Sequence, residues 1–263
     1  MTLEACLEIH EDGAARTLMI ARPERRNALD GATTEALRAA LGKAVADAGV
    51  RVIVLTGKGD KAFCAGGDLA DMERLEAAGF LAGHESRGEY AALLGELMDC
   101  PKPTIARLNG DALGGGLGLA MACDLAVAVE TARLGTPEVR VGLWPMMIMA
   151  VLLRTMPRRQ ALELMLTGGR LAAPEALAQG LLNRVVPAAE LDAAVAALVE
   201  AVSVGSPAVV ALGKQALAAM DGMPRRDALR FLQSMLSVNL ELDDAREGLG
   251  AFLARRAPEW KGR

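Results

Sequence analysis

Two glycine-rich segments and one glutamate form the pattern in this chain that could carry out chemistry. The segments are AFCAGGDL at residues 62–69 and NGDALGGGLG at residues 109–118, and Glu138 follows downstream. Glycine turns let a ligand approach backbone N–H groups closely, and fixed donors of this kind stabilise a carbonyl oxygen that gains negative charge. A carboxylate near that oxygen can move a proton. The pattern therefore predicts enolate chemistry with Glu138 as the acid/base.

Size and composition narrow the class of protein. The chain has 263 residues, 52% of them hydrophobic and 3% aromatic, with a net charge of −4. The length fits one large domain or a core with a smaller appendage. The mixed charge and the scarcity of aromatic residues argue against a nucleic-acid partner. No apolar stretch approaches the ~18–20 residues of a membrane span, so we expect no membrane contact.

The N-terminal residues and the cysteines indicate the compartment. Residues 1–6 show no cationic segment ahead of a hydrophobic one, so we expect no secretory signal and a cytoplasmic protein. The cysteines and the two histidines lack zinc-ligand spacing, and no metal is expected. Cys64 lies inside the first glycine segment, where it could be a nucleophile or a small buried residue. No histidine is near it in sequence, which favours the buried residue.

The elements that must position these residues alternate through the first 135 residues. Apolar β-rich runs predict strands at residues 18–21, 50–56, 103–108, 125–129 and, further along, 182–186. Helical spacing predicts a helix over residues 33–48, with Thr33 or Thr34 as its N-cap. The order of these runs indicates β-β-α units.

Beyond residue 146 the chain is predicted to be mostly helical. The expected helices begin at Pro145 and near Pro174 and cover residues 158–166, 191–202, 207–220, 225–240 and 243–255. Their apolar faces should pack on the core and on neighbouring subunits. We therefore divide the chain into a core, 1–200, and a C-terminal helical region, 201–263. Residues 70–90 place glycines among charges and are expected to form a mobile flap.

Several segments, in this order and spacing, resemble the crotonase family, the enoyl-CoA hydratase/isomerase superfamily. They are RPERRNAL at 22–29, AFCAGGDL at 62–69, NGDALGGG at 109–116, CDL at 123–125, PE at 137–138, EG at 247–248 and FLARRAP at 252–258. The resemblance covers essentially the whole chain. It implies an α/β fold, a ClpP-like spiral of β-β-α repeats, whose helical C-terminal region forms homotrimers or homohexamers.

The resemblance also implies an acyl-CoA substrate, with coenzyme A as part of the substrate and no separate cofactor. The oxyanion hole would be the backbone N–H groups of Gly67 and Gly115, with the dipole of the helix that starts at Gly115 adding to them. The remaining substrate-binding positions would be Arg25, Arg26, Lys61, Ala62, Ala65, Asp68, Leu69, Gly118 and Trp144. The cationic side chains among them suit phosphates.

Some of these residues have a plainer interpretation. Arg25 and Arg26 also fit an exposed loop pair. Asp68 fits the N-cap of a helix that begins near Leu69, and Asp111 fits a residue that shapes the turn after Gly110.

One position departs from the family pattern. Family hydratases use two glutamates: the second corresponds to Glu138, and the first falls on Gly118, which has no side chain. Addition of water needs the water to be held while the α-carbon is protonated. A shift of a double bond from C3 to C2 needs one base, and members that perform it resemble this pattern. The chain is therefore expected to isomerise 3-enoyl-CoA or to hydrate 2-enoyl-CoA. A substitute acid could come from the 70–90 segment, which contains Glu73, Glu76, His84, Glu85 and Tyr90.

The surroundings of Glu138 bear on its role. The apolar neighbours Val139, Val141, Leu143 and Trp144 would raise its pKa by desolvation, whereas pairing with Arg140 would make it a structural carboxylate. The run WPMMIM at 144–149 could line an acyl pocket or form ordinary helix core.

Other functions remain in competition. The chain could be a non-catalytic acyl-CoA-binding protein of this family, or a dehydratase of an unusual acyl-CoA. A serine peptidase of the Clp type is disfavoured because no serine stands in a GxSxG elbow. Nucleotide binding is disfavoured because no GKS or GKT follows the glycine run.

Overall fold

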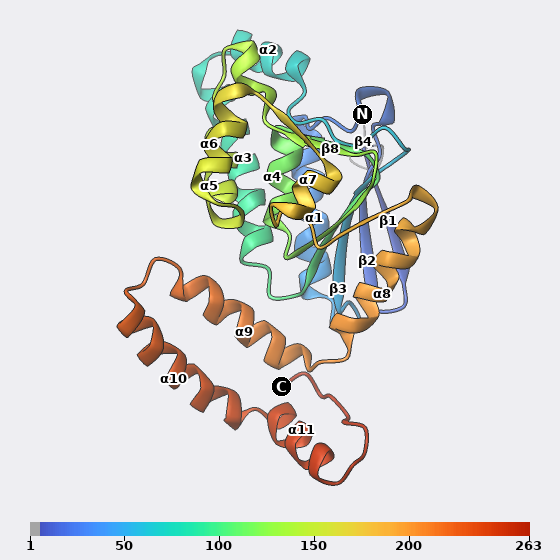
Figure 1. Ribbon diagram of the computed structural model, residues 1–263, viewed down its shortest axis with the longest axis vertical. Coiled ribbons are helices and arrows are strands. Elements are labelled where there is room, and N and C mark those ends of the chain that lie inside the picture. The colour runs from blue at the N-terminus through green and yellow to red at the C-terminus, as the bar shows by residue number, and fades with distance from the viewer. Residues whose placement is uncertain (1–5) are drawn as a thin grey trace.

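The computed structural model describes residues 6–263 of the chain (Figure 1). The strands are β1 Leu7–Asp12, β2 Ala15–Ile20, β3 Val52–Gly57, β4 Ala62–Cys64, β5 Thr104–Leu108, β6 Asp111–Leu113, β7 Leu125–Val129, β8 Arg133–Gly135, β9 Arg170–Ala172 and β10 Arg184–Val186. The helices are α1 Gly31–Ala46, α2 Leu69–Ala77, α3 Phe80–Met98, α4 Gly115–Ala122, α5 Met146–Thr155, α6 Arg158–Thr167, α7 Ala173–Ala178, α8 Leu191–Ser203, α9 Pro207–Met220, α10 Arg225–Glu241 and α11 Asp243–Leu253. Short 3₁₀ helices are η2 Pro23–Arg25, η3 Pro137–Val141 and η4 Ala188–Glu190. The prediction of no secretory signal depends mainly on residues 1–5, which lie outside the part of the chain that the structure describes.

The strands form two sheets, and each successive β-β-α unit contributes one strand to each sheet. The six-stranded sheet has the order β1-β2-β3-β5-β7-β10, and the four-stranded sheet has the order β4-β6-β8-β9. The strand pairs β3/β4, β5/β6 and β7/β8 each give one strand to each sheet. Within each sheet the strands of these pairs run parallel. The predicted β-β-α spiral is confirmed.

The larger sheet is covered on both faces, which explains its composition. All six residues of β3 are buried, as expected for a parallel strand with helices on both sides. Figure 1 shows α1 and α4 on one side of the strands and α8 on the other. The core is built from aliphatic side chains such as Leu18, Ile53, Ile105 and Leu117, together with Phe63.

The start of α1 differs from the prediction. The N-cap is Asp30, whose Oδ1 accepts the Thr33 N–H at 2.8 Å and the Thr33 hydroxyl at 2.7 Å. Thr33 and Thr34 are already inside the helix, so their assignment as N-caps was wrong. Asp30 is the N-cap because its carboxylate accepts the N–H of the third helical residue, which has no partner within the helix.

Residues 70–90, which are expected to form a mobile flap, fold into two helices. They make up most of α2 and the first half of α3, which meet at Gly79 with φ +112°. Gly83 is buried at the contact between these helices, where an added Cβ would lie 2.8 Å from Glu76 Oε1. Gly83, which looks like a loop residue in the sequence, therefore leaves room for the Glu76 side chain beside α3.

The C-terminal helices α9, α10 and α11 lie apart from the two sheets (Figure 1). The division expected after residue 200 falls inside α8, and the chain leaves the core at residues 204–206. Arg51 Nη2 donates to the Ser203 carbonyl at 3.2 Å across this junction. Lys214 Nζ on α9 donates to the Lys102 carbonyl at 2.9 Å, which attaches the region to the core.

Among the described residues, no helix alone is long and apolar enough to cross a membrane. The consecutive helices over Ala188–Ser203 and Pro207–Met220 meet those measures only as a pair bent by 97°.

Candidate active site

The two glycine turns lie against each other. They follow β4 and β6, which are parallel neighbours and so end at the same edge of the smaller sheet. An added Cβ at Gly66 would lie 3.2 Å from the Gly115 nitrogen and 3.0 Å from the Leu113 carbonyl oxygen. Gly66 also has φ +99°, a conformation that favours glycine. The turns therefore bring Gly67 and Gly115, which the resemblance to the crotonase family names together, near each other.

Helix α4 begins at this contact. Its first residue is Gly115, and Gly114 before it has φ +54°. The first N–H groups of a helix have no partner within the helix, and they carry its positive dipole end. The next glycine is required by packing, because a Cβ at Gly116 would overlap the Cys64 carbonyl oxygen. The start of α4 is thus a fixed set of donors held close to β4.

Glu138 lies beside the same helix start. Its Oε1 would be 2.7 Å from a Cβ at Gly114, and its Oε2 is buried without a hydrogen-bond partner among the described residues. The residue belongs to η3, and its carbonyl accepts the Leu143 N–H at 3.0 Å, which fixes the turn that carries it. The side chain therefore points back at the glycine run.

The electrostatics of Glu138 suit a proton carrier. Burial raises the pKa of its carboxyl group, although its own backbone N–H opposes the shift. The direction and its cause, desolvation, agree with the prediction. Of the four predicted apolar neighbours, Val139, Val141 and Leu143 are each more than a third exposed, whereas Trp144 is partly buried. Arg140 and Glu138 both lie in the described part of the chain, and they form no ion pair with each other.

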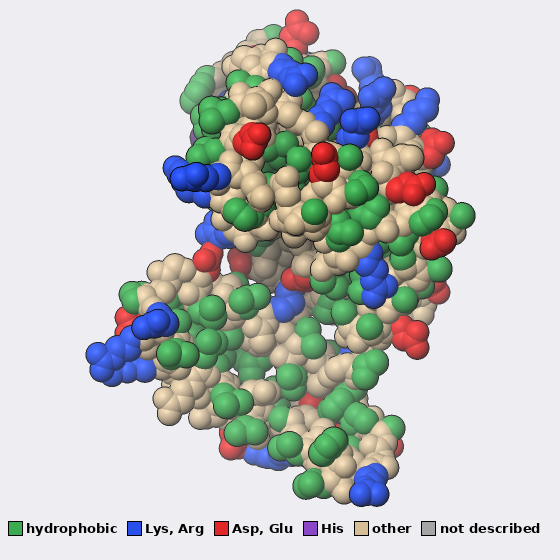
Figure 2. Space-filling view, viewed as in Figure 1, with side chains coloured by type: hydrophobic (Ala, Val, Ile, Leu, Met, Phe, Trp, Pro, Cys, Tyr) green, Lys and Arg blue, Asp and Glu red, His purple; other side chains and the backbone are tan. Residues whose placement is uncertain are grey.

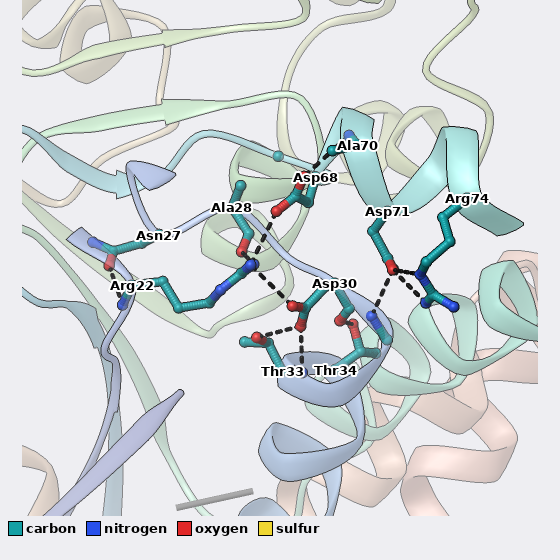
Figure 3. A network of polar contacts seen from close by, with 12 residues as sticks. Arg22, Asn27, Ala28, Asp30, Thr33, Thr34, Asp68, Ala70, Asp71 and Arg74 are labelled. Atoms are coloured by element: carbon teal, nitrogen blue, oxygen red, sulfur yellow. Dashed lines mark hydrogen bonds and ion pairs between the residues drawn. The ribbon is translucent and has the colours of Figure 1, made fainter. Parts of the chain in front are cut away.

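A buried ion network holds the turn that contains Gly67 (Figure 3). Arg22 Nη2 lies 3.0 Å from Asp68 Oδ2 and 2.9 Å from Asp30 Oδ2, and Arg22 also donates to the Ala28 carbonyl. Asp68 in turn caps α2, accepting the Ala70 N–H at 3.1 Å. Burial would raise the pKa of Asp68, but the bonds from Arg22 and the backbone outweigh it and hold the pKa below its usual value.

The prediction of Asp68 as an N-cap is confirmed, and the network adds a function to it. The Asp68 N–H donates to the Leu29 carbonyl at 2.8 Å, and the Leu29 N–H donates to the Gly66 carbonyl at 2.8 Å. These bonds hold Gly66 and Asp68, the neighbours of Gly67, against Leu29, and Arg22 bonds Asp68 and the residues on either side of Leu29. Asp111 has a different place from the predicted turn role: it opens β6, and its Oδ1 accepts the Arg133 N–H at 3.0 Å.

The residues predicted to bind coenzyme A surround the first turn. The Ala65 N–H donates to the Arg26 carbonyl at 3.0 Å, which joins the loop of Arg25 and Arg26 to the β4 end. Both arginines, Lys61 and Leu69 are exposed, whereas Ala62 is buried. Figure 2 shows Lys and Arg side chains gathered on the surface around this end of the molecule. An anion could approach the turn here without displacing an ion pair of Arg25 or Arg26 with any described residue.

Neighbouring side chains fill the space beside Gly118, the position that corresponds to the first glutamate of the family hydratases. An added Cβ at Gly118 would lie 2.5 Å from Tyr90 Oη and 3.2 Å from Ile148 Cγ1. Tyr90 Oη donates to the Gly115 carbonyl at 2.6 Å. Among the candidate substitute acids in the 70–90 segment, Tyr90 is therefore the one that contacts the glycine run. The remaining candidates, Glu73, Glu76, His84 and Glu85, are exposed.

The site is closed over Gly67 in this structure. Met72 Cε from α2 lies against the Gly67 Cα, in the place that a Cβ would take. Three residues of the 144–149 run, Trp144, Met147 and Met149, are partly buried and pack against the core, whereas Met146 is 65% exposed. A group that entered the space beside the Gly67 Cα would have to displace the flexible Met72 side chain.

Metal and thiol chemistry find little support in the described residues. They contain no group of three or more His, Cys, Asp or Glu side chains that could hold a metal ion. Burial raises the pKa of the Cys64 thiol to about 12, and its Sγ is fully enclosed beside the Gly66 carbonyl. A thiol with this pKa stays protonated and is a poor nucleophile. The interpretation of Cys64 as a small buried residue fits these findings.

This chain is similar in sequence to the members of one known family. The sequence model of the family described as Enoyl-CoA hydratase/isomerase matches residues 12–263. The chain belongs to this family. It is 38% identical over 250 residues to a candidate enoyl-CoA hydratase of Thermus thermophilus, covering 95% of this chain and 98% of that protein. It is 35% identical to a carnitinyl-CoA dehydratase of Salmonella typhi, covering 98% of both.

Solved structures of the enoyl-CoA hydratase/isomerase family show the same fold. The human enoyl-coenzyme A hydratase domain-containing protein 3 matches with a TM-score of 0.92 and 31% identity, covering 97% of this chain and 100% of that one. An enoyl-CoA hydratase from Bacillus anthracis matches with a TM-score of 0.91 and 30% identity, covering 98% and 100%. The crotonase resemblance and the α/β fold with a helical C-terminal region are thus confirmed.

Proposed function

We propose that the protein transforms an acyl-CoA thioester through an enolate, with Glu138 as the single acid/base. One observation carries the proposal: the Glu138 carboxylate, with Oε2 unpartnered, contacts Gly114 directly before the helix start at Gly115. The N–H groups of Gly67 and Gly115 would hold the thioester oxygen. Donors fixed in advance stabilise the charge that develops there without reorganising during the reaction.

The reaction that this arrangement supports best is isomerisation of a 3-enoyl to a 2-enoyl thioester. Ionised Glu138 takes a proton from C2, and the electron pair moves into the thioester oxygen to form a dienolate. The same carboxyl group then returns the proton at C4, which leaves the double bond between C2 and C3. One carboxylate therefore completes the cycle, and no water is consumed.

Hydration of a 2-enoyl thioester, or dehydration in reverse, is the second candidate. The names of the Thermus thermophilus and Salmonella typhi relatives favour it. Water would add its oxygen to C3 while C2 receives a proton. With glycine at position 118, the substrate would have to supply a polar group that holds the water, as in a dehydratase of an unusual acyl-CoA. The relatives support this class, and the absent side chain at 118 argues against it.

Coenzyme A would lie along the outer side of the first turn. Arg25, Arg26 and Lys61 are exposed there and would attract phosphates. The backbone near Ala62 and Ala65 would receive the adenine. We also infer homotrimers or homohexamers, formed through the C-terminal helices.

A paired assay tests the proposed reaction. Purified protein would be given crotonyl-CoA and 3-hexenoyl-CoA in parallel, and products would be read by mass and by absorbance of the conjugated thioester. Glu138→Gln should lower turnover by ~100-fold or more, the scale of general acid–base catalysis. Glu163→Gln, a change at an exposed carboxylate on α6, is the matched control and should leave turnover unchanged.

The outcomes separate the candidates. Conversion of the 3-enoyl substrate without added water supports the one-base isomerase, and fast hydration of crotonyl-CoA supports the second candidate. Turnover that survives in Glu138→Gln contradicts Glu138 as the acid/base. Binding of acyl-CoA without turnover of either substrate would point to a binding protein of this family.

A further inference from the structure

Tyr90 is the one tyrosine in the 263-residue chain, and it lies on α3 against the start of α4. The residue is partly buried and packs on the hydrophobic core. Its Oη donates to the Gly115 carbonyl at 2.6 Å. The phenol is therefore fixed at the residue whose N–H is the predicted oxyanion donor.

The ring covers one face of α4. An added Cβ at Gly115 would lie 3.4 Å from both Cζ and Oη of Tyr90, and one at Gly118 would lie 2.5 Å from Oη. Positions three apart lie on the same face of a helix. The remaining space beside Gly118 is bounded by Ile148 Cγ1 at 3.2 Å and Leu94 Cδ2 at 3.7 Å. The volume that a side chain at 118 would use is thus occupied by a phenol and two apolar groups.

Glu138 approaches the same helix start from another element. Its Oε1 would meet a Cβ at Gly114 at 2.7 Å, so the carboxylate and the phenol lie at consecutive glycines. Burial raises the pKa of Tyr90 well above its usual value, and the nearby carboxylate of Glu138 raises it further. The phenol accordingly remains a neutral O–H group, which can donate a hydrogen bond but cannot take a proton from water.

We propose that Tyr90 is the specificity-determining residue of the acyl site, where its phenol, through Oη, takes the place of a side chain at position 118 and closes the face from which an activated water would reach C3. The inference rests on the proposed function, since it concerns the fate of the enolate formed through Glu138. Hydration needs a base at this face to take a proton from the water whose oxygen bonds to C3. The phenol occupies the space that such a base would need. It does not affect the transfer of the proton from Glu138 to C4.

The partition of products tests this inference. The substrate 3-hexenoyl-CoA can give 2-hexenoyl-CoA and, after addition of water, 3-hydroxyhexanoyl-CoA, which differ in mass. Tyr90→Phe keeps the ring and should keep the wild-type product ratio. Gly118→Glu alone should gain no hydration because its Cβ meets Tyr90 Oη. The double variant Tyr90→Ala with Gly118→Glu should raise hydration relative to isomerisation by about tenfold or more, a modest share of a general-base effect.

The product ratio distinguishes a role of Tyr90 from a general effect of added space. Leu94→Ala with Gly118→Glu is the matched control, because it opens space at the same position and leaves the phenol in place. A gain confined to the variant without Tyr90 supports the inference. An equal gain in Gly118→Glu alone, or in the Leu94→Ala control, overturns it, since Tyr90 would then not decide the reaction. Circular dichroism and melting curves of each variant identify those that fail to fold.

A binding measurement tests the position of Tyr90 without turnover. Because the chain has one tyrosine, incorporated fluorotyrosine gives a single fluorine NMR signal from residue 90. Hexanoyl-CoA, which has no double bond to react, should shift this signal, whereas free coenzyme A should shift it less. Equal shifts with the two ligands would overturn the inference by placing Tyr90 away from the acyl group. This result is independent of whether Glu138 catalyses the proposed reaction.

Discussion

Glu138 and Gly114 are in direct contact: a Cβ at the glycine would lie 2.7 Å from Oε1 and 3.4 Å from the carboxyl carbon. Gly114 also has φ +54° and ψ −125°, a conformation that side chains with a Cβ adopt only under strain. The glycine therefore permits both the turn into α4 and the approach of the carboxylate. The position of the proposed acid/base depends on a residue that has no side chain.

Gly114→Ala is expected to displace the Glu138 carboxylate and to lower kcat by ~100-fold, the loss typical of a misplaced catalytic group. Steady-state kinetics with the substrate found in the paired assay would measure it. Gly180→Ala is the matched control. Gly180 has φ +83° and nothing within 4 Å of an added Cβ, so that change imposes backbone strain without touching the carboxylate. A similar loss in both variants would refute the contact as the cause.

The raised pKa of Glu138 has a consequence for stability. A carboxyl group whose pKa is higher in the folded state stabilises the fold fully below its unfolded value, 4.5, and this contribution is lost as the pH rises through the folded pKa. Glu138→Gln should therefore melt together with the wild type below pH 4.5 and at a higher temperature near neutral pH. Melting curves of both proteins, with Glu163→Gln as control, measure the difference. A constant difference across the pH range would contradict a buried, ionising Glu138.

The same shift predicts the pH dependence of activity. Glu138 must be ionised to accept the proton from C2, so kcat/KM should fall as the pH drops through a pKa that lies above 4.5. The fall should be absent from the residual activity of Glu138→Gln.

The main helices and strands were predictable where the sequence contains residues that start or stop an element. Residues 125–129 formed the expected strand β7, and residues 207–220 formed the expected helix α9, which Pro207 opens. These segments combine a clear apolar pattern with a residue that starts or stops the element. By contrast, three-residue strands such as β4 and β6 are too short to show a period of two.

The candidate site was predictable in part for the same reason. The glycine turns and Glu138 stand out because glycine and carboxylate have specific uses. The contact between Tyr90 and Gly118 has no such signal, because it joins α3 to α4 and depends on how two helices pack. The glycines of residues 79–88 also did not reveal that this segment is helical, with Gly83 beside the Glu76 side chain of α2.

Arg22 is expected to act as a positioning residue for the Gly67 turn. Its guanidinium bridges Asp30 and Asp68 while 8% of its side chain is exposed. Nη2 makes both of these contacts and Nη1 donates to the Ala28 carbonyl, so a lysine, which has a single side-chain nitrogen, cannot make all three. Arg22→Lys should therefore lower kcat more than it raises KM, and it should lower the free energy of unfolding by about 3 kcal/mol, as for a disrupted buried ion pair.

Kinetics and urea unfolding of Arg22→Lys would measure the two effects together. Arg74→Lys is the matched control, because Arg74 pairs with Asp71 in the same network of Figure 3 but is 69% exposed. An exposed pair contributes ~0–1 kcal/mol. If Arg22→Lys lowers stability but leaves kcat unchanged, the network supports the fold without orienting Gly67.

The C-terminal helices are expected to mediate self-association. None of the residues of α10 is buried in the single chain, and Leu229, Leu236, Leu249, Phe252 and Leu253 are each more than half exposed. Figure 2 shows hydrophobic side chains spread over this part of the molecule. Such apolar area is uncommon on a monomer's surface and is typical of an interface.

Light scattering after gel filtration should therefore give the mass of a trimer or of a multiple of trimers. Replacing Phe252 and Leu253 together by aspartate should shift the mass toward that of the monomer, because buried charges oppose the contact. Ile9→Asp, a change at a half-exposed apolar residue on β1, should leave the mass unchanged. A wild-type monomer would contradict the predicted trimer. A mass that persists in the double aspartate variant would place the interface on another face.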